Sequence, residues 1–207
     1  MNSEEELEEF KHYAAVLHHF QGYSASIAEI VKKYQRDYDS LTCEQKALVP
    51  TYEAKLRQVL ECSERNQKIL SSMVHDHLHN LDPLIELDRK NLPRERAQEN
   101  LRSLLRQIVR DWSEEGRSER QTSYGPIIGF IKTSVKGRKS ILVPGAGLGR
   151  LVYEICQLGH DCQGNEFSLF MLLPSEWILN SGLPVNSVAI HPWIIPFSNQ
   201  TSLHNQF

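Results

Sequence analysis

Residues 141–151 read I-L-V-P-G-A-G-L-G-R-L, and this stretch decides how the second half of the chain should fold. Its leading apolar residues are typical of a short strand buried on both faces. The alternating glycines predict a tight turn, after which residues 148–158 predict a helix that ends before Gly159. Residues 162–166 predict a second short strand. A strand, a crossover helix and a parallel strand make a right-handed βαβ unit, the start of a doubly wound sheet.

The glycine turn indicates a nucleotide-type ligand. Glycines let such a ligand approach the backbone, and the N-terminus of the following helix offers free N–H groups. Residues 145–149 have the spacing G-x-G-x-G, whereas a dinucleotide fingerprint is G-x-G-x-x-G. No Gly-Lys-Ser/Thr follows the turn, which excludes a P-loop. The turn alone separates a methyl donor from NAD only weakly.

An acid at the end of the second strand is an independent sign of such a ligand. A cofactor that contains adenosine needs an acceptor for its ribose hydroxyls about 20 residues beyond the first glycine. The segment Q-G-N-E (163–166) ends in an acid at that distance. A carboxylate can accept hydrogen bonds from both hydroxyls, and Gly164 leaves space beside it. Turn, helix and acid together indicate a nucleoside cofactor.

Residues 3 to about 135 have a helical period, because apolar residues recur at steps of three and four. The segments 3–20, 24–38, 51–79 and 95–113 are predicted to be helices. In the last of them, Gln107 and Arg110 lie three residues apart, opposite the apolar face. Periodicity alone favours an ordinary solvated surface for this pair.

Composition restricts the other classes of function. With 23 Lys+Arg against 26 Asp+Glu and no run of basic residues, nucleic acid is not an expected partner. The acidic N-terminus and the lack of a long apolar stretch predict an intracellular protein with no membrane partner. The location expected for it is the cytoplasm, and also the nucleus. The four cysteines are expected to be reduced and mostly buried. His75 and His79 lie one helical turn apart without a third ligand, so no metal site is expected.

Five longer stretches together carry a resemblance to a known family. The stretches are QIVRDWSEEGRSER (107–120), YGPII (124–128), ILVPGAGLGRL (141–151), QGNEFSLFML (163–172) and HPWIIPFSN (191–199). They resemble the carnosine N-methyltransferases, also called the N2227-like family, and the resemblance is close from about residue 94 to 204. The G-x-G-x-G turn resembles motif I of the class I S-adenosylmethionine-dependent methyltransferases, and Pro144 before it is this family's own form of the motif.

The resemblance implies transfer of a methyl group from S-adenosylmethionine to an imidazole nitrogen of carnosine, which gives anserine. It also implies that Gln107 and Arg110 contact the cofactor, which replaces the interpretation of this pair as part of a solvated surface. A guanidinium suits the methionyl carboxylate, which it can bind through two parallel hydrogen bonds. At the matching positions, Gly145 and Gly147 are implied to form the turn at the cofactor, and Glu166 to bind the ribose.

The sequence therefore predicts an α/β chain with a helical region at 1–93 and a partial S-adenosylmethionine-binding domain at 94–207. The second region is expected to contain only the first βαβ part of a Rossmann-like sheet, with motif I and the second strand. The family's dipeptide-pocket and catalytic residues are expected to lie beyond Phe207, which leaves apolar side chains such as Phe167 and Phe170 without neighbours. We expect this chain alone to be inactive. The alternative is a non-catalytic helical interaction module, which packs on a partner or, as a homodimer, on a second copy.

Overall fold

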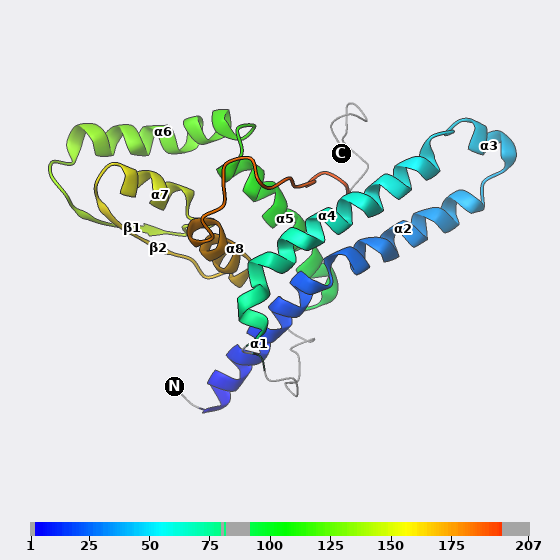
Figure 1. Cartoon of the computed structure of the whole chain (residues 1–207), viewed down its shortest axis with the longest axis horizontal. Helices are drawn as coiled ribbons and strands as arrows, with labels where there is room; N and C mark the ends of the chain where they lie inside the picture. Colours follow the sequence, from blue (N-terminus) through cyan, green and yellow to red (C-terminus); the bar gives the residue numbers. More distant parts are fainter. Residues whose placement is uncertain (1–2, 80, 82–91, 196–207) are drawn as a thin grey trace. The chain divides into compact units, whose positions relative to one another are not determined.

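The computed structural model describes residues 3–79, 81 and 92–195 (Figure 1). The chain divides into two compact units, one formed by residues 1–102 and 185–207 and the other by residues 103–184. The first unit is helical, and the second combines helices with a two-stranded parallel sheet. The protein thus has a mixed, helix-rich architecture with a small sheet.

Long amphipathic helices build the first unit. They are α1 (Ser3–Gln21), α2 (Tyr23–Asp39) and α4 (Tyr52–Leu78). α2 and α4 lie side by side and are joined through α3 (Cys43–Ala47), while α1 packs against α4 (Figure 1). Each fully buried aliphatic or aromatic side chain in this core contributes about 1.5–3 kcal/mol to folding. The core includes Leu17, Phe20, Ile27, Leu56, Val59 and Leu70.

The short helix α3 forms because two reciprocal hydrogen bonds cap its N-terminus. The Thr42 hydroxyl accepts a hydrogen bond from the Gln45 N–H at 3.3 Å, and the Gln45 side chain accepts one from the Thr42 N–H at 2.9 Å. This capping box satisfies two backbone donors that the helix itself leaves without partners. Five residues carry no measurable apolar period, so α3 is not among the predicted helices.

The four predicted helices are confirmed, with ends that differ by no more than one residue. α5 (Arg94–Trp112) begins directly after Pro93. α6 (Arg117–Ser134) belongs to the stretch with a helical period but is not one of the four. Gly125 and Pro126 in its middle obscure it, because both residues are unfavourable inside a helix.

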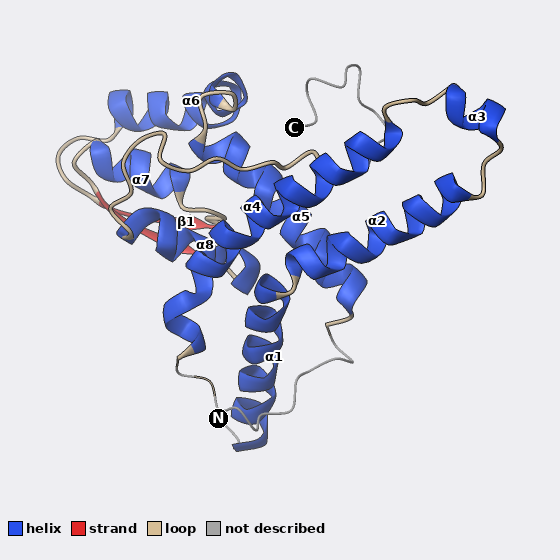
Figure 2. Cartoon of the chain, turned by 45° about the vertical axis from the view of Figure 1, so that its right-hand side comes forward, coloured by secondary structure: helices blue, strands red, loops and turns tan. Residues whose placement is uncertain are grey.

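The predicted βαβ unit is present in the second unit. β1 (Ser140–Pro144) and β2 (Asp161–Asn165) pair in parallel, in a register that runs from Ser140 opposite Asp161 to Pro144 opposite Asn165. α7 (Arg150–Gln157) connects them and packs against β2 (Figure 2). β2 lies one residue earlier than predicted, which places Glu166 just after the strand.

The expectation that the first strand is buried on both faces is wrong. Leu142, at the centre of β1, is 60% exposed, while its neighbours Ile141 and Val143 are half-buried. In the described part of the chain α7 packs on one face of this small sheet, so the alternate side chains of β1 differ in burial. Phe167 is 98% exposed, as expected, but Phe170 is buried, because it belongs to α8 (Leu169–Asn180) and not to an open strand end.

The cysteines are free thiols, but most of them are not buried. Cys62 on α4 is buried, and burial raises the pKa of its thiol. Cys43 and Cys156 are exposed, and Cys162 is intermediate. The expectation of mostly buried thiols is therefore wrong, because Cys43 and Cys156 lie on the outer sides of the short helices α3 and α7.

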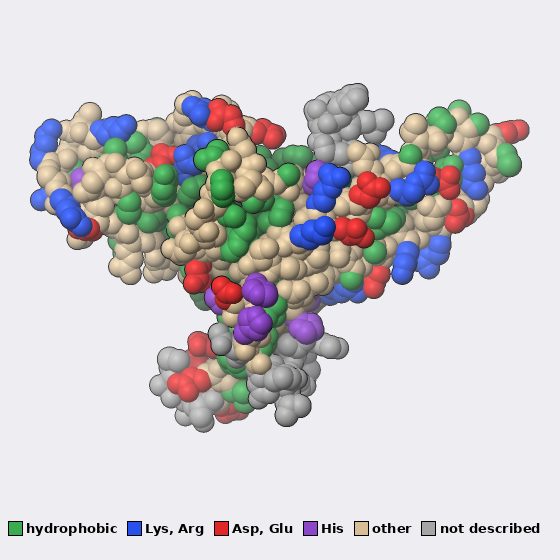
Figure 3. Space-filling model, in the orientation of Figure 1, with side chains coloured by type: hydrophobic (Ala, Val, Ile, Leu, Met, Phe, Trp, Pro, Cys, Tyr) green, Lys and Arg blue, Asp and Glu red, His purple; other side chains and the backbone are tan. Residues whose placement is uncertain are grey.

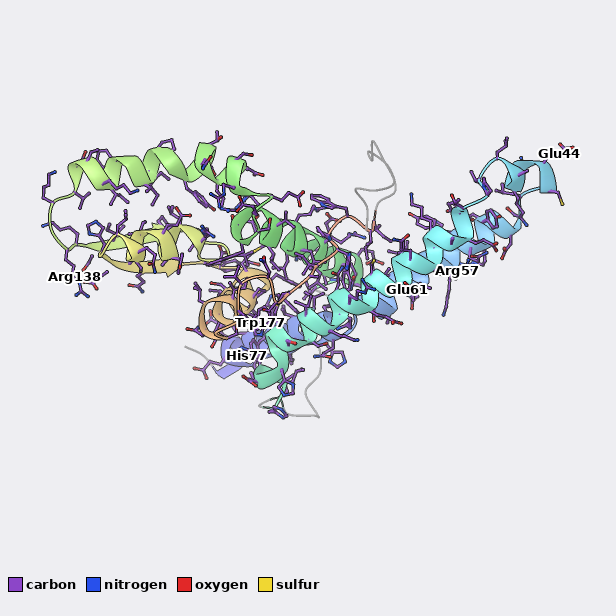
Figure 4. The ribbon with its side chains drawn as sticks, turned by 45° about the horizontal axis from the view of Figure 1, so that its top comes forward. Glu44, Arg57, Glu61, His77, Arg138 and Trp177 are labelled. Carbon is purple, nitrogen blue, oxygen red and sulfur yellow. The ribbon has the colours of Figure 1, made fainter. Side chains whose placement is uncertain are left out.

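Charged side chains of both signs cover the visible outer surface of the α2–α4 pair (Figure 3). Arg57 and Glu61 are examples that project from α4 (Figure 4). These are the polar faces that amphipathic helices leave outside their core. Within the described segments, no helix is long and apolar enough to span a bilayer.

Candidate functional site

The glycine turn between β1 and α7 is a left-handed bend. Gly145, Gly147 and Gly149 have φ values of 65°, 55° and 75°, which residues with a Cβ rarely adopt. A Cβ at Gly149 would lie 3.0 Å from side-chain atoms of Leu179 and Ser175 on α8, so this glycine is required for packing. A Cβ at Gly145 would meet nothing within 4 Å, so the start of the bend faces open space. We refer to residues 145–149 as the glycine bend.

The side chain of Glu166 lies against the glycine bend. Its Oε2 accepts a hydrogen bond from the Gly147 N–H at 2.9 Å, and its Oε1 accepts from the N–H groups of Phe167 and Ser168 at 2.8 and 2.9 Å. Partial burial opposes the charged form of this carboxyl, but the three N–H donors outweigh it and lower the pKa of Glu166. The acid after β2 is therefore held ionised beside the bend after β1.

Gly164 makes this arrangement possible, for a reason that the sequence does not give. A Cβ at this position would lie 2.8 Å from the Cβ of Ala146 and 3.0 Å from a methyl carbon of Val152. The missing side chain thus lets the glycine bend and α7 approach β2. The expectation that Gly164 leaves space beside the acid is replaced by this packing role.

The end of α5 brings Gln107 and Arg110 to one buried carboxylate, that of Asp111. Gln107 Nε2 donates to Asp111 Oδ2 at 3.0 Å, and Arg110 Nε donates to Asp111 Oδ1 at 3.0 Å. The Tyr124 hydroxyl on α6 donates to the same Oδ1 at 3.2 Å. A Cβ added at Gly147 would lie 3.6 Å from Gln107 Nε2, so the Gln107 amide lies against the glycine bend.

The charges in this cluster support one another. Burial disfavours the charged form of Arg110, but the hydrogen bond and the negative charge of Asp111 outweigh it and raise the pKa of the guanidinium. Burial and the charge of Asp111 raise the pKa of the Tyr124 phenol, which keeps its proton and donates it. Asp111 is only 1% exposed, and a carboxylate buried this deeply needs such partners.

Hydrogen bonds join the end of α5 to the glycine bend, to α7 and to α6. Trp112 Nε1 donates to the Leu148 carbonyl of the bend at 3.2 Å, and an Arg150 Nη of α7 donates to the Asp111 carbonyl at 3.2 Å. Arg120 of α6 donates to the carbonyl of Arg110 at 2.6 Å. The last carbonyls of a helix have no partner within it, so the contacts from Arg150 and Arg120 satisfy two of them. Trp112 is half-buried at this contact.

Sequence comparisons agree on one family. A family profile described as carnosine N-methyltransferase matches residues 88–207, more than half of the chain. The chain is 40% identical over 206 residues to the carnosine N-methyltransferase of Mus musculus, and this match covers 95% of the chain and 52% of the relative. This protein belongs to the carnosine N-methyltransferase family. It is also 33% identical over 234 residues to carnosine N-methyltransferase unmet of Drosophila melanogaster, a match that covers 97% of the chain and 50% of the relative. The chain spans about half the length of the curated relatives it matches.

Within this carnosine N-methyltransferase family member, the residues predicted to contact a cofactor lie in the same unit. Gly147 is bonded to Glu166 and lies next to Gln107, and Gln107 shares Asp111 with Arg110. Sequence reasoning missed Asp111. A signal was present, because Asp111 lies seven residues after Leu104 and three after Ile108, on the face that the apolar period marks as buried.

Tyr124, Arg120 and Arg150 were also missed, because no local pattern marks a side chain that bonds to a distant helix end. At His75 and His79, where no metal site is expected, the two rings lie edge to face with centroids 4.9 Å apart. Among the residues that the structure describes, no group of three or more His, Cys, Asp or Glu is placed to hold a metal ion.

Proposed function

We propose that the glycine bend, Glu166, Gln107 and Arg110 bind S-adenosylmethionine, and that the βαβ unit is the first part of a Rossmann-like class I methyltransferase sheet. The observation that carries this proposal is the hydrogen bond from the Gly147 N–H to Glu166 Oε2. It joins the turn after the first strand to the acid after the second, the two features that a nucleoside cofactor requires together. The boundary between residues 93 and 94 remains our proposal for the start of the methyltransferase domain.

The groups around the bend fit this cofactor chemically. A carboxylate has about four acceptor positions, and the three N–H groups on Glu166 leave capacity for a ribose hydroxyl. Arg110 keeps its charge and can bind a carboxylate with the N–H groups that Asp111 does not occupy. The open space beside Gly145 lets a ligand reach the backbone of the bend.

The reaction we propose is methylation of the imidazole of carnosine, to give anserine. The cofactor, when bound, supplies a methyl group on a sulfonium, which already carries a good leaving group. The protein then has to hold a neutral imidazole nitrogen in line with that group and to exclude water. An imidazole titrates near about 6.5, so much of the dipeptide is neutral at cellular pH without a strong base.

We also propose that this chain alone binds the cofactor weakly and forms no anserine. Leu142 at the centre of the sheet and Phe167 beside Glu166 are exposed by 60% and 98%. Exposed apolar side chains beside a proposed site indicate that this chain alone leaves the site open to water. Methyl transfer requires water to be excluded.

Calorimetric titration with S-adenosylhomocysteine tests the cofactor assignment. We expect a Kd in the micromolar range, which at 1 μM corresponds to a binding free energy of about −8 kcal/mol. In Glu166→Ala we expect no measurable binding. Glu119→Ala is the matched control, because Glu119 is an exposed residue of α6 in the same unit, and its binding should equal that of the unchanged chain.

Four outcomes would each contradict one of these proposals. Unchanged binding in Glu166→Ala would show that Glu166 is not the acid that binds the ribose. Displacement of S-adenosylhomocysteine by NAD would favour an oxidoreductase. No binding by a folded protein that associates with itself would favour the interaction module. Formation of anserine by the purified chain would overturn the proposed inactivity.

A further inference from the structure

Asp111 connects two side chains that are proposed to contact the cofactor, and one of them, Arg110, is proposed to bind its carboxylate. Its Oδ2 accepts from Gln107 and its Oδ1 from Arg110 and Tyr124, so both oxygens are engaged by donors. The side chain is almost completely buried, and the proposed contacts with the cofactor do not include it. A buried charge with three donors costs more to disturb than a surface pair, so it fixes the groups around it.

This carboxylate determines which end of the Gln107 amide faces away from it. A carboxylate only accepts hydrogen bonds, so it must face the amide nitrogen and not the amide oxygen. The Gln107 oxygen is thereby turned away from Asp111 and remains an acceptor for another group. The same carboxylate holds Arg110 through Nε, which orients the rest of the guanidinium as a donor.

We propose that Asp111 is a positioning residue that sets Gln107 as an acceptor and Arg110 as a donor, a pair that recognises an α-ammonium group next to a carboxylate. This inference rests on the proposed cofactor site and adds its specificity. The ligand class it defines is a nucleoside that carries an amino-acid zwitterion. Asp111 itself does not touch the ligand.

Asparagine at this position would reverse the polarity of one side of the cluster. Its amide has one accepting oxygen, so its NH2 group must face either Gln107 or the Arg110–Tyr124 pair, all of which donate. If the NH2 group faces Gln107, the Gln107 amide turns over and presents its own NH2 to the ammonium group. Moving the end of α5 to relieve this conflict would break the hydrogen bonds of Trp112 to Leu148 and of Arg150 to the Asp111 carbonyl.

The test compares two ligands that differ only at the amino-acid end. S-adenosylhomocysteine carries the zwitterion, and 5′-methylthioadenosine lacks it. We expect Asp111→Asn to weaken binding of S-adenosylhomocysteine by 10- to 100-fold in calorimetry and to change binding of 5′-methylthioadenosine by less than about twofold. Asp161→Asn is the matched control and should leave both affinities unchanged, because Asp161 is exposed at the start of β2 and pairs with Arg138.

Tyr124→Phe keeps the proposal testable if Asp111→Asn does not fold. It removes one of the three donors to Asp111, and we expect a loss of two- to fivefold for S-adenosylhomocysteine only. An equal loss for both ligands in a folded variant would show a merely structural role for Asp111, and no loss for either would overturn the inference as well. If the unchanged chain binds 5′-methylthioadenosine and S-adenosylhomocysteine equally, the inference fails while the proposed function stands; if it binds neither, the proposed function itself has failed.

Discussion

The two units of this protein bury different kinds of side chain. The core of the helical unit is apolar, and its buried polar residues, such as Asn66, are uncharged. Among the described residues, the two charged side chains that are buried, Asp111 and Arg120, both belong to the unit with the sheet. Apolar packing stabilises a helix wherever its apolar face is covered by other side chains. A buried charge is stable only where charged or hydrogen-bonding partners surround it. The comparison indicates that the first unit is stabilised mainly by apolar packing, whereas the second combines apolar packing with a buried cluster of charged groups.

A pair of matched substitutions would break this comparison most strongly. Leu70→Ala in α4 removes a fully buried side chain, and we expect a loss of about 2–5 kcal/mol in the free energy of unfolding. Leu142→Ala in β1 removes the same atoms from a side chain that is 60% exposed, and we expect a loss within about 0.5 kcal/mol. Denaturant unfolding of both variants measures the difference. Equal losses would mean that the face of β1 is covered in solution.

A smaller loss of stability is expected at Asn66, a buried polar residue in the mostly apolar core of the helical unit. Its amide donates to the His191 carbonyl at 2.9 Å and accepts from the His191 N–H at 2.8 Å, which fixes the backbone at His191 to α4. Asn66→Ala leaves these backbone groups without partners, so we expect a loss of about 1–3 kcal/mol. In the same variant, the rate of hydrogen exchange at the His191 amide should increase as the free energy of unfolding falls. Protection that stays unchanged would show that the segment is held by its apolar contacts.

The smallest effect concerns pH in the unit with the sheet. Partial burial acts against the ionised Glu166 carboxyl, but three N–H donors lower its pKa below the unfolded value of about 4.3. A lowered pKa in the folded state stabilises the protein above the unfolded pKa, and this contribution is lost as the pH falls through the folded value. The difference in unfolding free energy between the protein and Glu166→Gln should therefore be constant from about pH 8 to 5 and shrink below about pH 4. A difference that changes near neutral pH would contradict the observed hydrogen bonds.

Much of the fold could be predicted because its signals are local. The apolar periods of α1, α2, α4 and α5 gave their positions to within one residue, and the glycine spacing gave the turn between β1 and α7. α3 and α6 lie in the stretch with a helical period but were not among the four predicted helices, because α3 is only five residues long and Gly125 and Pro126 obscure the pattern of α6. The burial of Leu142 was predicted wrongly, because an apolar run shows that a strand can be covered and not whether anything covers it.

The sequence by itself determined the candidate ligand residues, since Gly145, Gly147 and Glu166 stand at spacings that parallel strands bring to one edge. Only the tertiary structure decided what fixes them. Asp111 and Tyr124 are 13 residues apart on different helices, and their contact depends on how α5 and α6 pack. A glycine turn is encoded by backbone freedom at consecutive positions, whereas a buried carboxylate acquires its partners only when separate elements meet.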